Sequence, residues 1–140
     1  MDRAAFAAGP GSSTDPADQV LAALVTGRLD DAQRLVAASW TADPSFRLRA
    51  LAADVRCARG DHEAAIDAYR VLLAETVGGP REAVVRQHLG KALLAAGRLT
   101  DAQEQFEQAL RRREAAGAAA DLVASSRLAL DRVRELLAGA

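Results

Sequence analysis

The side chains that could carry out chemistry are few in this sequence. Its only cysteine, Cys57, has Arg56 and Arg59 as neighbours, and nearby positive charge favours the reactive thiolate. The two histidines, His62 and His88, stand in no Glu-x-x-His or His-x-x-x-His pattern, which would place metal ligands on one helix face. We expect Cys57 to be a small, half-buried packing residue, with a slightly activated thiol as the alternative. We expect neither histidine to bind a metal or to act as a general base.

The densest basic cluster is the run Arg111-Arg112-Arg113. Three consecutive arginines can contact phosphates, which would make nucleic-acid binding sensitive to salt. They also fall at the end of an expected helix, where cations interact favourably with the helix dipole. We expect a solvated helix terminus. The net charge of −1, from 18 basic and 19 acidic residues, gives no general attraction to nucleic acid or to an anionic membrane.

The rest of the sequence offers no arrangement typical of an enzyme. It contains no Gly-x-Ser-x-Gly nucleophile elbow, and no glycine-rich phosphate loop follows a strand. A single cysteine excludes a multi-cysteine zinc site. We therefore expect no catalytic residues, no cofactor and no metal. An enzyme or a small-ligand sensor is the least favoured interpretation.

Hydropathy and the N-terminal composition bear on localisation. No apolar run approaches the ~20 residues that a membrane-spanning helix needs. Residues 1–14 hold one arginine, two glycines and Pro10 but no apolar h-region, so they do not resemble a secretory signal. We expect these residues to form a flexible tail. We also expect a cytoplasmic protein that binds neither nucleic acid nor membranes.

A repeated spacing indicates how the chain is organised. Three times a glycine is followed five residues later by an alanine and four residues after that by a bulky side chain, and the glycines are 33 and 37 residues apart. The three copies are Gly27/Ala32/Val36, Gly60/Ala65/Tyr69 and Gly97/Ala102/Phe106. Self-similarity at this period predicts stacked helical hairpins rather than one globular core.

Apolar residues that recur every three or four positions predict seven helices in an all-α fold. They are expected from Pro16 to Gly27, Asp30 to about Ala42, Pro44 to about Ala58, Asp61 to about Thr76, about 81–95, Thr100 to the 111–117 segment, and about 119–137. The expected N-caps include Asp15, Asp30, Asp43, and Thr100 paired with Gln103 in a capping box. The Val77–Pro80 segment is the clearest break, and it accounts for the longer second period.

The third copy, His88–Leu110, resembles the tetratricopeptide repeat, or TPR. Leu89-Gly90 matches the Leu-Gly pair of that signature, and Leu93 stands at its tyrosine position. Ala102, Phe106 and Ala109 match the later small and aromatic positions. Gly90 and Ala102 should let the two helices of the hairpin approach closely, while Phe106 should fill the space between that hairpin and its neighbour. The other copies match less well, and Pro16, Arg49 and Arg86 stand where the repeat has tryptophan.

The resemblance implies a right-handed α-solenoid of three antiparallel helical hairpins, with repeats at about 15–43, 44–77 and 81–115. A capping helix at about 119–137 completes a single TPR-like domain over 15–138. The first helix of each hairpin would line a concave groove for a peptide or a partner helix. By this analogy the groove residues are Ala17, Leu21, Leu24, Arg47, Ala50, Asp54, Cys57, Val84, Gln87, Lys91 and Leu94.

The function expected from this resemblance is a non-enzymatic interaction module that acts as a scaffold or regulator. A basic clamp for a C-terminal carboxylate is not expected, because only Arg47 and Lys91 could contribute and asparagine is absent from the chain. Self-association into a homodimer, through the groove or the last helix, is the alternative. Trp40 is expected to pack against the following hairpin rather than to anchor an interface.

Overall fold

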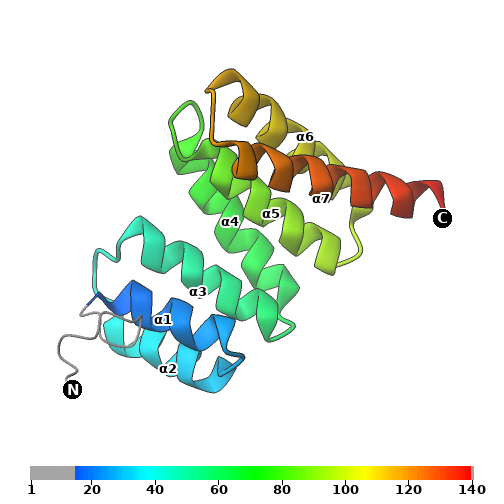
Figure 1. Cartoon of the computed structure of the whole chain (residues 1–140). Helices are drawn as coiled ribbons and strands as arrows, with labels where there is room; N and C mark the ends of the chain where they lie inside the picture. Colours follow the sequence, from blue (N-terminus) through cyan, green and yellow to red (C-terminus); the bar gives the residue numbers. More distant parts are fainter. Residues whose placement is uncertain (1–14, 140) are drawn as a thin grey trace, which may run out of the picture. The chain divides into compact units, whose positions relative to one another are not determined.

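The computed structural model describes residues 15–139, and all regular structure in this range is α-helical, with seven helices and no strand (Figure 1). This confirms the predicted all-α class and the predicted number of helices. The expected flexible tail, residues 1–14, lies outside the described residues. The chain divides after Gly60 into two compact units. We call residues 15–60 unit 1 and residues 61–139 unit 2; the predicted single domain stays a prediction.

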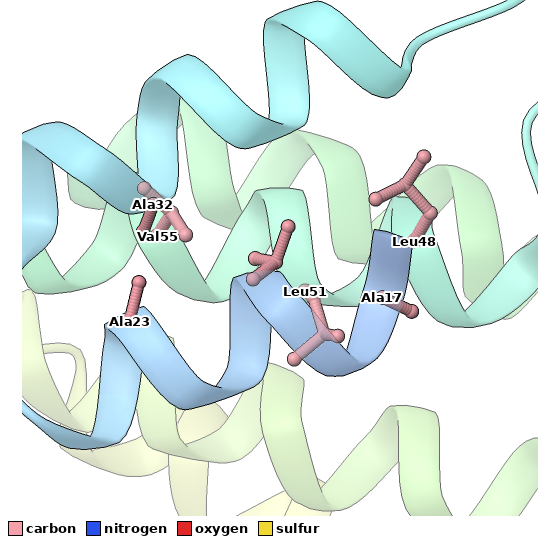
Figure 2. Close-up of a cluster of buried hydrophobic side chains, with 7 residues drawn as sticks. Ala17, Ala23, Ala32, Leu48, Leu51 and Val55 are labelled. Atoms are coloured by element: carbon pink, nitrogen blue, oxygen red, sulfur yellow. The ribbon is translucent and has the colours of Figure 1, made fainter. Parts of the chain in front are cut away.

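Unit 1 consists of three helices, α1 (Pro16–Val25), α2 (Leu29–Ser39) and α3 (Phe46–Ala58). Each of the three packs against the other two. Figure 2 shows their shared core, in which alanines of α1 and α2 meet larger aliphatic side chains of α3. The buried members are Ala17, Val20, Ala23, Ala32, Leu48, Leu51 and Val55. Small side chains at these contacts let the helix axes approach closely, which keeps the core dense despite its low aromatic content.

Unit 2 consists of four helices, α4 (His62–Thr76), α5 (Glu82–Ala95), α6 (Leu99–Ala115) and α7 (Ala120–Ala138). Each helix packs against the next in the chain. The alanine and the bulky residue of the second and third copies of the repeated spacing are all in the interior, with Tyr69 and Phe106 the two largest fully buried side chains. The repeated spacing therefore marks core positions in this unit, as the sequence predicted.

The glycine of each copy forms the turn between two helices. Gly27, Gly60 and Gly97 have φ angles of 75°, 91° and 80°, a left-handed conformation that costs little only without a Cβ. After Gly27 and Gly97 the next amide closes a longer hydrogen bond, from Arg28 N to Ala23 O and from Arg98 N to Leu93 O, each 2.9 Å. This is the Schellman arrangement, and it confirms the predicted helix ends.

The close approach predicted at Gly90 is present. A Cβ added to Gly90 would lie 2.6 Å from Cε1 of Phe106, well inside van der Waals contact. Phe106 is fully buried and Ala102, one turn earlier on α6, is buried as well. The ring of Phe106 on α6 thus occupies the space that a side chain at position 90 on α5 would need, which confirms the predicted close approach of the two helices.

Several predicted helix starts are wrong. Asp15 does cap α1, since its Oδ1 accepts from Ala17 N at 2.9 Å. However, α2 begins at Leu29 and α6 at Leu99, so Asp30 and Thr100 lie in the first turns, and Arg28 and Arg98 occupy the N-cap positions without side-chain caps. The reason is the short Schellman turn, after which the next helix starts at once. The capping box of Thr100 and Gln103 is therefore not formed.

The third helix also starts later than predicted. Ser45, not Asp43, is its N-cap, and Ser45 Oγ accepts from Leu48 N at 3.1 Å. The preceding helix ends at Ser39, and Trp40 follows in an extended conformation. The indole is 47% exposed, so the predicted packing of Trp40 against the following hairpin is wrong. The early end of α2 turns this residue out of the helix surface that was expected to bury it.

Candidate functional site

The predicted groove residues of unit 1 separate into buried and accessible positions. Ala17 is 2% exposed and belongs to the core, and Leu24 packs against that core. Leu21 is 37% exposed and is accessible on α1. Arg47 is exposed, but its Nη1 lies 2.5 Å from Asp18 Oδ1 and 3.5 Å from Asp15 Oδ2, so its charge is engaged within the unit. The remaining positions are half-buried, namely Ala50, Asp54 and Cys57.

Cys57 is a packing residue rather than an activated thiol. Burial raises the pKa of its thiol, and the negative charge of Asp54 raises the pKa further. The positive neighbours Arg56 and Arg59 do not reverse this, and the side chain of Arg59 is directed to Asp30 through an ion pair between Nη1 and Oδ1. The thiolate is therefore disfavoured, which favours the packing role over the activated thiol considered from the sequence.

The predicted groove residues of unit 2 lie on α5 with different accessibility. Val84 and Leu94 are half-buried and Lys91 is exposed. Gln87 is only 3% exposed and is hydrogen-bonded inside the unit, so its placement on an open groove is wrong. Its burial follows from α7, which carries the partner Ser126. The groove as one continuous surface stays a prediction.

Large aliphatic side chains nevertheless remain exposed on particular helices. On α1, Leu21 and Val25 are 37% and 72% exposed, and they are one helical turn apart. Val25 was not among the predicted groove residues, although its spacing from Leu21 could have identified it. Outside α1 the exposed large hydrophobic residues among those described are Trp40, Val71, Val77, Leu122 and Leu128.

A buried carboxylate, not singled out by the sequence, lies at the start of α5. Glu82 is 4% exposed. Its Oε1 accepts from Gly78 N at 2.9 Å, and its Oε2 lies 2.7 Å from Arg86 Nε and 2.5 Å from Arg112 Nε. Burial would raise the pKa of Glu82, but the hydrogen bonds from Gly78, Arg86 and Arg112 lower that pKa to about 2. This ionised group therefore joins the Val77–Pro80 turn, α5 and α6.

A second polar network lies between α5, α6 and α7. Arg113 is 6% exposed, and its Nη1 donates to Leu122 O at 3.0 Å and to Ser126 Oγ at 2.9 Å. Ser126 in turn donates to Gln87 Oε1 at 2.7 Å. Gln87 Nε2 is fully buried and has no hydrogen-bond partner among the described residues. Burial lowers the pKa of Arg113, and the charge of Asp121 opposes this shift.

These findings correct the expectation for the arginine run. Arg111 is exposed as predicted, but Arg112 pairs with Glu82, and Arg113 is buried under α7. A solvated helix terminus is therefore wrong for two of the three residues. The sequence held one usable signal, because three adjacent helical positions are spread over about 200° of the helix circumference and do not share one face.

A hollow of about 480 Å³ adjoins both networks. Its walls come from the 78–80 turn, the first turn of α5, the end of α6 and Leu122 of α7. The charged groups in these walls are Glu82, Arg112 and Arg113. The other side chains are almost all small and apolar, chiefly alanines at the end of α6 and after it.

Neither histidine lines this hollow. The ring of His88 stacks on Tyr69, with centroids 5.9 Å apart and planes inclined by 24°. Within residues 15–139, no three His, Cys, Asp or Glu side chains are grouped to hold a metal ion. None of the helices described is both long enough and apolar enough to traverse a lipid bilayer.

Comparison of the chain with protein-family models, with curated proteins and with solved structures gave no match. The resemblance to the tetratricopeptide repeat accordingly rests on the residues of the chain itself.

Proposed function

We propose that this chain is a TPR-like interaction module whose helical hairpins form a right-handed solenoid. In this proposal it acts without catalysis as a scaffold or regulator, and it holds an extended peptide or a partner helix. Support comes from the all-α fold, the left-handed glycine after the first helix of each copy, and the tight Gly90–Phe106 contact within the best-matching repeat.

The exposed aliphatic pair on α1 is the observation that carries the proposal. Leu21 and Val25 present two large apolar side chains on one helix face, 37% and 72% exposed. Transfer of such side chains from water to a protein partner contributes about 1.5–3 kcal/mol for each one fully buried. The resemblance assigns α1 to the first helix of a hairpin, the helix that lines the binding face. A partner with its own apolar stripe would bury both side chains.

Capture by charge variants tests this assignment. The full chain is immobilised, incubated with a native extract, and the retained proteins are identified for wild type, Leu21→Glu and Val25→Glu. Val71→Glu is the matched control, because Val71 is 54% exposed on α4, a helix outside the proposed groove. Circular dichroism confirms that all variants remain helical. We expect both α1 variants to lose the same proteins that Val71→Glu retains.

Equal retention by wild type and Val25→Glu would overturn the assignment of the binding face. Equal loss by Val25→Glu and Val71→Glu would do the same, since the effect would then be nonspecific.

Self-association through α7 is the second candidate. Leu128 is 73% exposed near the middle of this helix, and Leu122 is 44% exposed. A symmetric pair of α7 helices would bury Leu128 of both copies. Light scattering tests this directly: a dimer that Leu128→Glu converts to a monomer supports it, and a monomeric mass for wild type at high concentration rejects it.

A further inference from the structure

The hollow beside α5, α6 and α7 contains a buried cation, Arg113, that forms no direct ion pair with a carboxylate of the described residues. Arg113 is 6% exposed, and no Asp or Glu oxygen of the described residues lies within 4.0 Å of its guanidinium. Both of its hydrogen bonds use Nη1 and go to neutral oxygens, the Leu122 carbonyl and the Ser126 hydroxyl. Asp121 acts on this charge only from beyond ion-pair distance. A buried charge without a directly paired counter-ion is unfavourable, so an anion in contact with it would be stabilising.

The two other guanidinium nitrogens of Arg113 are available to an anion, because Nε and Nη2 form no hydrogen bond with the described residues. Among the described residues, Gln87 Nε2 is the only side-chain nitrogen or oxygen that is both fully buried and without a hydrogen-bond partner. The unpaired Nε and Nη2 of Arg113 are therefore not fully buried. Nε and Nη2 therefore keep access to solvent, and Arg113 lines the hollow. These two nitrogens form the side of a guanidinium that binds a planar carboxylate through two parallel hydrogen bonds.

The walls of the hollow define the rest of the ligand. The charged residues that line the hollow, Glu82, Arg112 and Arg113, sum to +1, while Asp121 acts on Arg113 from outside the lining. This balance suits at most one negative charge. The Glu82 carboxylate would repel a second negative charge, which disfavours a phosphate dianion. Ala83, Ala116 and Leu122 provide apolar walls, and a volume of about 480 Å³ accommodates a short hydrocarbon chain.

We propose that this hollow binds a small organic monocarboxylate, with its carboxylate on Arg113 and its short apolar chain against the alanine-rich wall. This site lies within unit 2 and is distinct from the proposed partner face on α1. The chain would then combine a protein-binding surface with a small-molecule site.

Nuclear magnetic resonance titration of the full chain tests the site with defined probes. Butyrate is compared with butyramide, a neutral compound of the same shape, and with inorganic phosphate. We expect butyrate to shift the backbone amides of residues 78–83 and 113–118 and the Nε–H signal of Arg113 in a saturable manner. Butyramide and phosphate should bind at least about tenfold more weakly, a difference of about 1.4 kcal/mol.

A second test uses a variant that fills the hollow without changing its charge, so that the charged networks stay intact. Ala83→Leu places a larger side chain in the wall, and Ala74→Leu on the exposed face of α4 is the matched control. We expect Ala83→Leu to weaken butyrate binding at least about tenfold while Ala74→Leu leaves it unchanged. Equal binding of butyrate and butyramide, phosphate binding as tight as butyrate, or full affinity in Ala83→Leu would each overturn the proposal.

Discussion

The hydroxyl of Ser126 on α7 lies 2.7 Å from the side-chain oxygen of Gln87 on α5, and both residues are buried. A residue that the repeat pattern assigns to a binding surface is thus fixed in the interior of unit 2. The same hydroxyl accepts a hydrogen bond from Arg113. One serine on α7 therefore links α5 and α6.

Ser126→Ala is expected to destabilise the protein by about 1–3 kcal/mol. The change leaves Gln87 Oε1 without its donor and removes one of two acceptors from the buried Arg113 guanidinium. The adjacent exposed residue gives the control, and Ser125→Ala should change stability by no more than about 0.5 kcal/mol. Urea denaturation followed by circular dichroism measures both, and equal stability of the two variants would contradict the role of Ser126.

Gly90→Ala is expected to destabilise the protein although alanine is the better helix former. Alanine would normally gain about 1 kcal/mol in a helix interior. Here the new Cβ would lie 2.6 Å from Cε1 of the buried Phe106 ring, and overpacking of this kind costs about 1–3 kcal/mol. In a Phe106→Leu background the smaller side chain removes the clash, so the same Gly90→Ala change should become neutral or stabilising. A double-mutant cycle of unfolding free energies without coupling would refute the contact.

Glu82 is expected to make stability depend on acidity. Its pKa is about 2 in the folded protein against an ordinary value of 4.5, so its stabilisation is complete above pH 4.5 and is lost as the pH falls from there toward 2. Because Arg112 is 38% exposed and solvent screens its charge, we expect a contribution of about 1–2 kcal/mol. Glu82→Gln should therefore be less stable than wild type at pH 7, and the two stabilities should converge near pH 2.

Unfolding free energies measured across this pH range decide the outcome. Asp67→Asn is the control, because Asp67 is an exposed carboxylate on α4. Its stability should run parallel to wild type at every pH. A constant difference between Glu82→Gln and wild type from pH 7 to pH 2 would show that the ionised carboxylate is not the source of the stabilisation.

Ser45→Ala is expected to destabilise unit 1 by about 1 kcal/mol through loss of the N-cap of α3. Asp43→Ala should have an effect below about 0.5 kcal/mol, because its carboxylate caps no helix. Thermal unfolding of the two variants side by side separates these cases. A larger loss of stability in Asp43→Ala than in Ser45→Ala would show that Asp43 caps the helix, as the sequence predicted.

Local constraints in the sequence predicted much of the fold. A left-handed turn needs glycine, so Gly27 and Gly97 located helix ends reliably. The choice between neighbouring caps was less predictable, because Ser45 and Asp43 have similar intrinsic preference. The choice between Ser45 and Asp43 depends on the path of the chain between the end of α2 at Ser39 and the start of α3 at Phe46.

The polar part of the candidate site was not predictable from spacing. Apolar periodicity identifies core positions such as Phe106, but it gives no signal for a buried arginine or glutamate. Arg113 and Ser126 become buried only because α6 packs against α7, and their partners are distant in the sequence. Gln87 was mistaken for a surface residue for the same reason.

Photo-crosslinking from α1 tests the central claim most directly, namely that this helix face holds a protein partner. A photoreactive phenylalanine analogue replaces Val25 in one preparation and Val71 in another, since both positions are more than half exposed, at 72% and 54%. After irradiation in a native extract, we predict a discrete crosslinked protein from position 25 that position 71 does not give. No adduct from position 25, or the same adducts from both positions, would contradict the claim.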